Sequence, residues 1–185
     1  HMELQDYPSA IAAFSRSLNS LDQSDTDFEL DVMYYLAAVR EVYGETDKAI
    51  EVYTDILKNG KDIKSLFQRG KLYLSEELHE EAAADVAMAI EKSRDYSLYI
   101  DIFQVYDDQN MTSEGTKYLE RALEVEPDSG ADYYQRGRVY YCMKDYEAAK
   151  AELTEAIKKE DQDAILLLGK VYLIMEDAAS ARAMY

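Results

Sequence analysis

The stretch from Gly130 to Asp161, GADYYQRGRVYYCMKDYEAAKAELTEAIKKED, decides how the whole chain folds. Its apolar and small residues form two stripes, which are Tyr133, Gly137 and Tyr140, and then Tyr146, Ala149, Leu153 and Ala156. Intervals of three and four residues place each stripe on one face of its own helix. The stretch therefore predicts a helical hairpin that turns at residues 143–145, with Gly137 and Ala149 where the two helices approach most closely.

The same register recurs along the rest of the chain. Anchors equivalent to Gly137 follow one another at intervals of 33, 33, 34 and 32 residues, at Ala37, Gly70, Phe103, Gly137 and Gly169. Twelve residues after each anchor come Ala49, Ala82, Gly115, Ala149 and Ala181. A fixed period of this length is the mark of an array of helical repeats.

This period and this order of residues resemble the tetratricopeptide repeat family, and ALEVEP at residues 122–127 is similar to the family's usual repeat ending. The resemblance implies an all-α fold, a right-handed α-solenoid of antiparallel helical hairpins forming one tetratricopeptide-like superhelix over residues 1–185. We expect a half repeat at 3–20, repeats at 30–62, 63–95, 96–129 and 130–161, and a truncated repeat at 162–185. Counting the incomplete ends, this gives about eleven helices.

The fourth repeat departs from the pattern in a way that predicts a volume exchange. Phe103 occupies the small anchor position, and Gly115 replaces the alanine expected opposite it. Since overfilling a packed core is unfavourable, we expect the missing methyl group of Gly115 to make room for the ring of Phe103.

Composition and motifs exclude several classes of function. A net charge of −18 repels phosphate, so no nucleic-acid partner is expected. The single cysteine, Cys142, excludes an internal disulfide, and no Cys/His cluster has zinc spacing, so we expect no metal and no cofactor. No apolar run is long enough to span a membrane. Because no phosphate-binding loop, HExxH or nucleophile elbow is present either, we expect no catalytic residues and no enzyme.

The two ends of the sequence predict a fragment of a longer protein. His1-Met2 resembles a cloning scar, and the first repeat lacks its first helix. We expect the targeting segment to be missing and the parent protein to be either cytoplasmic or lipid-anchored outside the cytoplasm. The truncated last repeat leaves an uncapped end at residues 165–168, which predicts end-to-end self-association.

The resemblance also implies where a ligand binds, because in this family the first helices of the repeats line a concave groove. The register places three sets of residues beside it: Tyr34, Phe67, Ile100, Tyr134 and Leu166; Ala38, Lys71, Gln104, Arg138 and Lys170; and Glu41, Leu74, Asp107, Tyr141 and Leu173. From these we take as peptide-binding residues Tyr34, Phe67, Lys71, Gln104, Tyr134, Arg138, Tyr141 and Lys170. Aromatic and basic side chains together predict an acidic, partly apolar peptide. Alternatively, the cations simply balance neighbouring acids across repeats.

One ligand class of the family does not fit this chain. The co-chaperones that hold the acidic tails of heat-shock chaperones use a clamp of lysines and asparagines. The clamp's lysine position here holds Tyr, Phe, Ile, Tyr or Leu, and its asparagine position holds Ala, Lys, Gln, Arg or Lys. No adjacent pair of repeats reproduces the clamp, so a different ligand is expected.

We therefore expect a non-catalytic scaffold that binds proteins or peptides in its groove. Two alternatives stay open. The chain could be a structural spacer or assembly segment of a larger bacterial protein, such as a surface component or lipoprotein. It could also belong to an enzyme or a cell-surface glycan-handling complex whose active part lies outside these residues.

Overall fold

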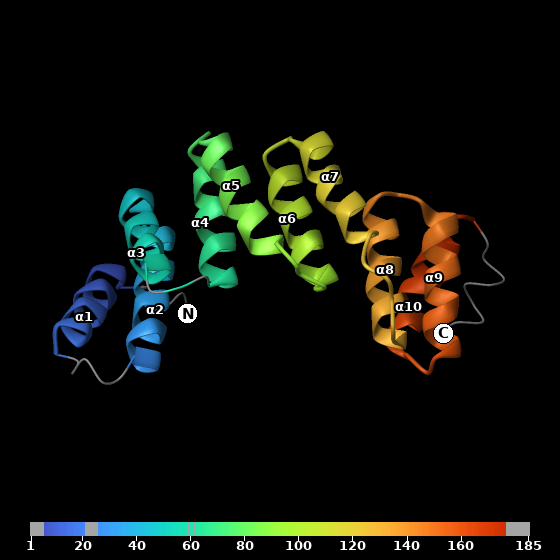
Figure 1. The fold of residues 1–185 in the computed structure, drawn as a ribbon, viewed down its shortest axis with the longest axis horizontal. Helices are drawn as coiled ribbons and strands as arrows, with labels where there is room; N and C mark the ends of the chain where they lie inside the picture. Colours follow the sequence, from blue (N-terminus) through green and yellow to red (C-terminus); the bar gives the residue numbers. More distant parts are fainter. Residues whose placement is uncertain (1–5, 21–25, 59, 61, 177–185) are drawn as a thin grey trace. The chain divides into compact units, whose positions relative to one another are not determined.

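The computed structural model describes residues 6–20, 26–58, 60 and 62–176, and all secondary structure in those residues is helical (Figure 1). The chain divides into two compact units. The N-terminal unit runs to Glu91 and the C-terminal unit begins at Lys92. The fold class predicted from the repeats, an all-α helical-repeat solenoid, is confirmed.

The N-terminal unit contains five helices. They are α1 (Tyr7–Ser20), α2 (Thr26–Tyr43), α3 (Thr46–Lys58), α4 (Ile63–Ser75) and α5 (His79–Ile90). Each helix packs on the next one along the chain. The helices α2 and α3 form one antiparallel hairpin, and α4 and α5 form the next (Figure 1).

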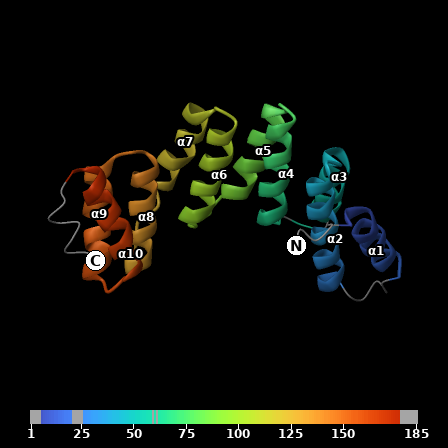
Figure 2. The ribbon, with the colours of Figure 1, turned by 180° about the vertical axis from the view of Figure 1, so that it is seen from behind.

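The C-terminal unit contains the other five described helices. They are α6 (Tyr96–Asp108), α7 (Thr112–Ala122), α8 (Gly130–Cys142), α9 (Tyr146–Lys158) and α10 (Asp163–Ile174). The predicted hairpin at residues 130–161 is α8 packed on α9, and α10 packs on both of them (Figure 2). The eleventh helix expected from the sequence falls in residues 177–185, outside the described residues.

One backbone conformation recurs with the period predicted from the anchors. Seven residues after each anchor lies one residue with a positive φ: Gly44 (86°), Glu77 (61°), Asn110 (60°), Lys144 (62°) and Glu176 (60°). A left-handed residue of this kind commonly ends a helix and reverses the chain. In the first four turns the next amide donates to the carbonyl of the residue three after the anchor, as Asp145 N donates to Tyr140 O at 3.0 Å. Four turns of one design therefore follow the period of the repeat, and the positive φ of Glu176 falls at the same interval.

The small residues lie where the predicted packing requires them. A Cβ added to Gly137 would lie 2.8 Å from Cγ and Cδ2 of Leu153, and Ala149, Leu153 and Ala156 are fully buried. The predicted contact between Phe103 and Gly115 is also present. A Cβ at Gly115 would lie 3.1 Å from the carbonyl oxygen of Phe103 and 3.2 Å from its Cδ2.

Two hairpins each contain an ion pair between their two helices, which the sequence did not reveal. In α4 and α5, Arg69 Nε and Nη2 donate to Asp85 Oδ2 and Oδ1, both at 2.7 Å. In α8 and α9, Arg136 Nε and Nη2 donate to Glu152 Oε2 and Oε1 at 2.9 and 2.8 Å. Both pairs span sixteen residues. Two-point Arg–carboxylate contacts of this kind fix the geometry of a pair more firmly than a single hydrogen bond does.

Candidate functional site

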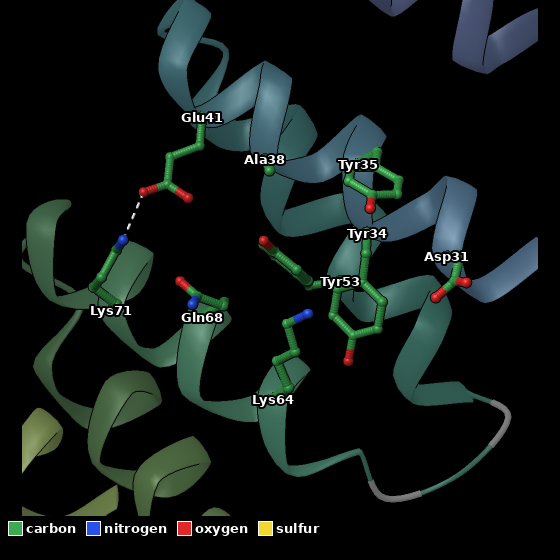
Figure 3. A pocket seen from close by; sticks show the side chains of 9 residues that line it. All are labelled: Asp31, Tyr34, Tyr35, Ala38, Glu41, Tyr53, Lys64, Gln68 and Lys71. Carbon is green, nitrogen blue, oxygen red and sulfur yellow. Dashed lines mark ion pairs between the residues drawn. The ribbon is translucent and has the colours of Figure 1, made fainter. Parts of the chain in front are cut away.

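The N-terminal unit has a hollow of about 360 Å³, which we call the α2–α4 hollow. It is lined by Asp31, Tyr34, Tyr35, Ala38 and Glu41 of α2, Tyr53 of α3, and Lys64, Gln68 and Lys71 of α4 (Figure 3). Tyr34 and Lys71, two of the predicted ligand-binding residues, therefore face the same space.

Contacts within the protein engage most of the polar groups of the α2–α4 hollow. The hydroxyl of Tyr34 donates to Asp62 and accepts a hydrogen bond from Ser65 Oγ at 2.9 Å. Lys64 Nζ lies over the Tyr34 ring, 4.4 Å from its centroid. Lys71 Nζ is 2.7 Å from Glu41 Oε1, the ion pair drawn in Figure 3. For Lys71 the alternative prediction, that the cation balances an acid on a neighbouring repeat, is therefore correct.

The C-terminal unit has a second hollow, of about 290 Å³, which we call the α8–α10 hollow. It is lined by Ile100 and Gln104 of α6, by Tyr134, Arg138, Tyr141 and Cys142 of α8, and by Asp163, Leu166, Leu167 and Lys170 of α10. Five of the eight predicted ligand-binding residues are in this list: Gln104, Tyr134, Arg138, Tyr141 and Lys170.

The polar groups of the α8–α10 hollow are less engaged. Arg138 Nη1 donates to Gln135 Oε1 at 2.7 Å. Among the described residues, no group forms an ion pair with Arg138 or Lys170, and none hydrogen-bonds the hydroxyl of Tyr134. Burial raises the pKa of the Cys142 thiol and that of the Asp101 carboxyl, and the nearby Arg138 guanidinium opposes both shifts. Arg138 thus supplies positive potential around this hollow.

Some predicted groove positions lie elsewhere. Leu74 is only 2% exposed, so the prediction that it faces a groove is wrong: it is a core residue. Ile100 is 1% exposed and contributes to the α8–α10 hollow only as part of its buried lining. Phe67 is half-buried on α4 and is not among the residues that line the α2–α4 hollow.

Other lining residues were missed because only the positions three before, one after and four after each anchor were placed at the groove. Positions six before the anchor also line the hollows, at Asp31, Lys64 and Asp163, and so do positions two before it, at Tyr35, Gln68 and Leu167. Helical geometry could have found them, since residues three and four apart share a face.

The described residues lack two other features. Within those residues no helix combines the length and the apolar character needed to cross a membrane. In the same residues no three His, Cys, Asp or Glu side chains are grouped so as to hold a metal ion.

The geometry defines a class of protein, one built from antiparallel helical hairpins that present hollows on the first helix of each hairpin. The family model for the tetratricopeptide repeat matches residues 133–158, which are the hairpin of α8 and α9. This hairpin is therefore similar to the tetratricopeptide repeat, as the sequence predicts.

The chain is 27% identical over 159 residues to the Hsp70-Hsp90 organising protein of Plasmodium falciparum (isolate 3D7), a match that covers 79% of the chain. The chain spans only about a quarter of that relative's length, 26%.

Solved structures with the same fold include BtubC (BKLC) from P. vanneervenii, with a TM-score of 0.63 and 18% identity, covering 97% of this chain and 88% of that one. A tetratricopeptide repeat protein from Parabacteroides merdae ATCC 43184 has a TM-score of 0.56 and 17% identity, covering 97% and 71%.

Proposed function

We propose that this chain is a non-catalytic scaffold that binds a protein or peptide ligand on the first helices of its repeats, with the α8–α10 hollow as the principal contact. One observation carries the proposal. The sequence register alone selected eight residues, and five of them line this one hollow on three different helices.

The side chains of the hollow suit peptide recognition. Tyr134 and Tyr141 offer large rings that lose little conformational freedom on binding, and Tyr141 is held by an edge contact with Tyr146, 5.9 Å between ring centroids. Arg138 and Lys170 add charge that orients a ligand. Since packed helices already hold these groups in place, the protein loses little ordering entropy when a ligand binds.

The relative's name suggests a role in organising other proteins, and a scaffold that joins partners agrees with it. The chaperone tails themselves are not proposed as ligands. At the positions of the family's lysine and asparagine clamp, the α8–α10 hollow has Tyr134 and Arg138, followed by Leu166 and Lys170.

The N-terminal unit favours a second candidate function, that of a spacer or assembly segment. Tyr34 and Lys71 are already engaged by Asp62, Ser65 and Glu41. A ligand would have to displace these contacts, so a structural role fits this unit better than a binding role does.

A screen of the purified protein against a diverse immobilised peptide library tests the proposal. The double variant Tyr134→Ala/Arg138→Ala is screened in parallel, with Lys117→Ala as the matched control because Lys117 is an exposed cation of α7 that does not line the hollow. The proposal predicts peptides that the double variant loses and the control retains. Peptides that bind all three proteins equally would place the site elsewhere, and the absence of any binder would favour the spacer.

A further inference from the structure

We propose that the outer face of α5 is a second docking surface of this protein, and that its partner is a basic amphipathic helix. The outer face consists of five exposed residues that helical spacing places on one side of α5, which are Glu80, Glu81, Ala84, Ala87 and Met88. The proposal goes beyond the function proposed for the α8–α10 hollow, because it concerns the second helices of the N-terminal unit, α3 and α5.

The middle of the outer face carries no charge, although Ala84, Ala87 and Met88 are all exposed. Met88 lies six residues after Ala82, the packing residue of α5, and is 44% exposed. At the same position in α3, α7 and α9 the side chain is charged, and these residues are Asp55, Arg121 and Glu155. The solvated side of a helix normally carries charged and polar residues, so an uncharged one indicates a contact surface.

A hollow of about 400 Å³ adjoins Met88, and we call it the α3–α5 hollow. Its apolar lining comes from three helices, since Leu57 belongs to α3, Leu66 to α4 and Met88 to α5. Leu66 is 2% exposed and Leu57 is half-buried, so the packing of the hairpins holds both in place. The hollow therefore offers space for an apolar side chain next to the outer face of α5.

The two cations that line the α3–α5 hollow are engaged within the protein. Lys58 Nζ is 2.6 Å from Asp55 Oδ1. Arg69 forms its two-point contact with Asp85, and its Nη1 also donates to Thr54 Oγ1 at 2.9 Å. An anionic ligand would have to break these contacts, whereas an apolar side chain leaves them intact.

The small residues of the outer face favour a helix as the partner. Ala84 and Ala87 are three residues apart, and their short side chains let the backbone of another helix approach closely. A leucine or phenylalanine of that helix can then enter the α3–α5 hollow beside Met88, whose flexible side chain adapts to the shape of its neighbour. This is how a groove recognises the apolar face of an amphipathic helix.

The acidic end of the outer face determines the charge of the partner. Glu80 and Glu81 lie in the first turn of α5, four and three residues before Ala84. In the part of the chain that the structure describes, no cation forms an ion pair with either carboxylate. Lysine or arginine residues of the partner complement these carboxylates. A second copy of this chain, with its net charge of −18, does not.

Fluorescence anisotropy tests the proposal with three fluorescein-labelled peptides of about 18 residues, which form about five helical turns. The basic peptide has leucine at intervals of three and four residues and lysine elsewhere. The acidic peptide has glutamate in place of every lysine. The scrambled peptide has the composition of the basic one, with its leucines spread over all sides of the helix. Because an acidic protein attracts any basic peptide, the scrambled peptide gives the baseline, in about 0.15 M salt.

Ala84→Gln tests the close approach, because it adds a long side chain to the outer face without a charge, and both residues are good helix formers. Ala151→Gln is the matched control, since Ala151 is exposed and has the same register position in α9 as Ala84 has in α5. The basic peptide should bind the unaltered protein about tenfold more tightly than the scrambled peptide. Ala84→Gln should remove this difference, and Ala151→Gln should keep it.

The double variant Glu80→Gln/Glu81→Gln tests the charge of the partner. Its control, Glu114→Gln/Glu120→Gln, removes two exposed carboxylates from α7. The affinity for the basic peptide should fall about fivefold in the first double variant and stay unchanged in the second. Equal losses in the two double variants would show general attraction to the acidic protein and overturn the proposal.

Four other results would overturn the proposal. They are equal binding of the basic and scrambled peptides, an equal loss in Ala84→Gln and Ala151→Gln, tighter binding of the acidic peptide, and dimers of the protein alone that Ala84→Gln abolishes. The last of these would identify a second copy as the partner. Tyr134→Ala/Arg138→Ala should bind the basic peptide as the unaltered protein does, and a loss there would place this peptide in the α8–α10 hollow instead. The library screen decides the proposed function separately.

Discussion

Replacing Gly137 by alanine tests the close approach of α8 and α9, on which the repeat depends. The new Cβ would lie 2.8 Å from both Cγ and Cδ2 of Leu153, a side chain with no exposed surface. Overfilling a packed core costs about 1–3 kcal/mol, and alanine recovers about 1 kcal/mol of helix propensity relative to glycine. We expect the free energy of unfolding of the C-terminal unit to fall by about 1 kcal/mol.

Gly70 provides a matched control, because it is the same anchor in the hairpin of α4 and α5. A Cβ at Gly70 would be 3.4 Å from its nearest neighbours, which are atoms of Ala82, Asp85 and Val86. That is close to ordinary contact, so Gly70→Ala should be neutral or stabilise the N-terminal unit by up to about 1 kcal/mol.

The free energy of unfolding of both variants is measured in urea, with hydrogen-exchange mass spectrometry as the readout. Peptides from each unit then report the stability of that unit separately. A double-mutant cycle with Leu153→Ala should show coupling of about 1 kcal/mol between positions 137 and 153. If Gly137→Ala stabilises its unit as much as Gly70→Ala does, the reasoning about this contact is refuted.

Three further predictions concern the ion pairs, the tyrosines and the C-terminal helix. Asp85→Ala leaves the guanidinium of Arg69 without its carboxylate in a hairpin where Asp85 is only 2% exposed, so urea unfolding should show a loss of about 3 kcal/mol. The double variant Arg69→Leu/Asp85→Val has the residues found at the same register in the hairpin of α2 and α3, which are Leu36 and Val52. Its free energy of unfolding should stay within about 1 kcal/mol of that of the unaltered protein. A loss as large as that of Asp85→Ala would contradict this account. Burial, with a smaller contribution from Glu41, raises the pKa of Tyr53 to about 12. Because the neutral phenol is favoured in the folded state, this contribution to stability is full below about pH 10 and is lost as the pH rises to the folded pKa. The free energy of unfolding of Tyr53→Phe should therefore decline less steeply in that pH range than that of the unaltered protein. Identical dependence of the two proteins on pH would count against the prediction. The self-association predicted from the uncapped end at residues 165–168 should give concentration-dependent oligomers in sedimentation velocity, and Leu166→Glu, at a side chain of α10 that is 55% exposed, should abolish them. A chain that sediments as a monomer at all concentrations would dismiss that prediction.

Most of the fold could be predicted because the residues that pack in a repeat array recur in the sequence at a fixed interval. Gly137, Ala149 and Leu153 are where their spacing places them, and Gly115 lies against Phe103 as the register requires. The left-handed turn residues gave no such signal. Only Gly44 is a glycine, whereas Glu77, Asn110, Lys144 and Glu176 adopt the same conformation with side chains that do not reveal it.

The candidate site was less predictable, because a register identifies a face but not what each side chain contacts. Tyr34 and Tyr134 hold the same register position. Tyr34 is engaged because Asp62 and Ser65 at the start of α4 reach its hydroxyl, and such a contact depends on neighbours outside the periodic positions. Lys71 and Arg138 differ in the same way, since Glu41 pairs with Lys71 and no described carboxylate pairs with Arg138.

The most direct test of the central claim, that the first helices carry the binding face, is hydrogen exchange of the protein with and without a peptide selected in the screen. The account predicts slower exchange in residues 134–142 of α8 and in residues 163–173 of α10, with α9 unchanged. Protection confined to the second helices, α7 and α9, would contradict it and place the ligand on the opposite side of the hairpins.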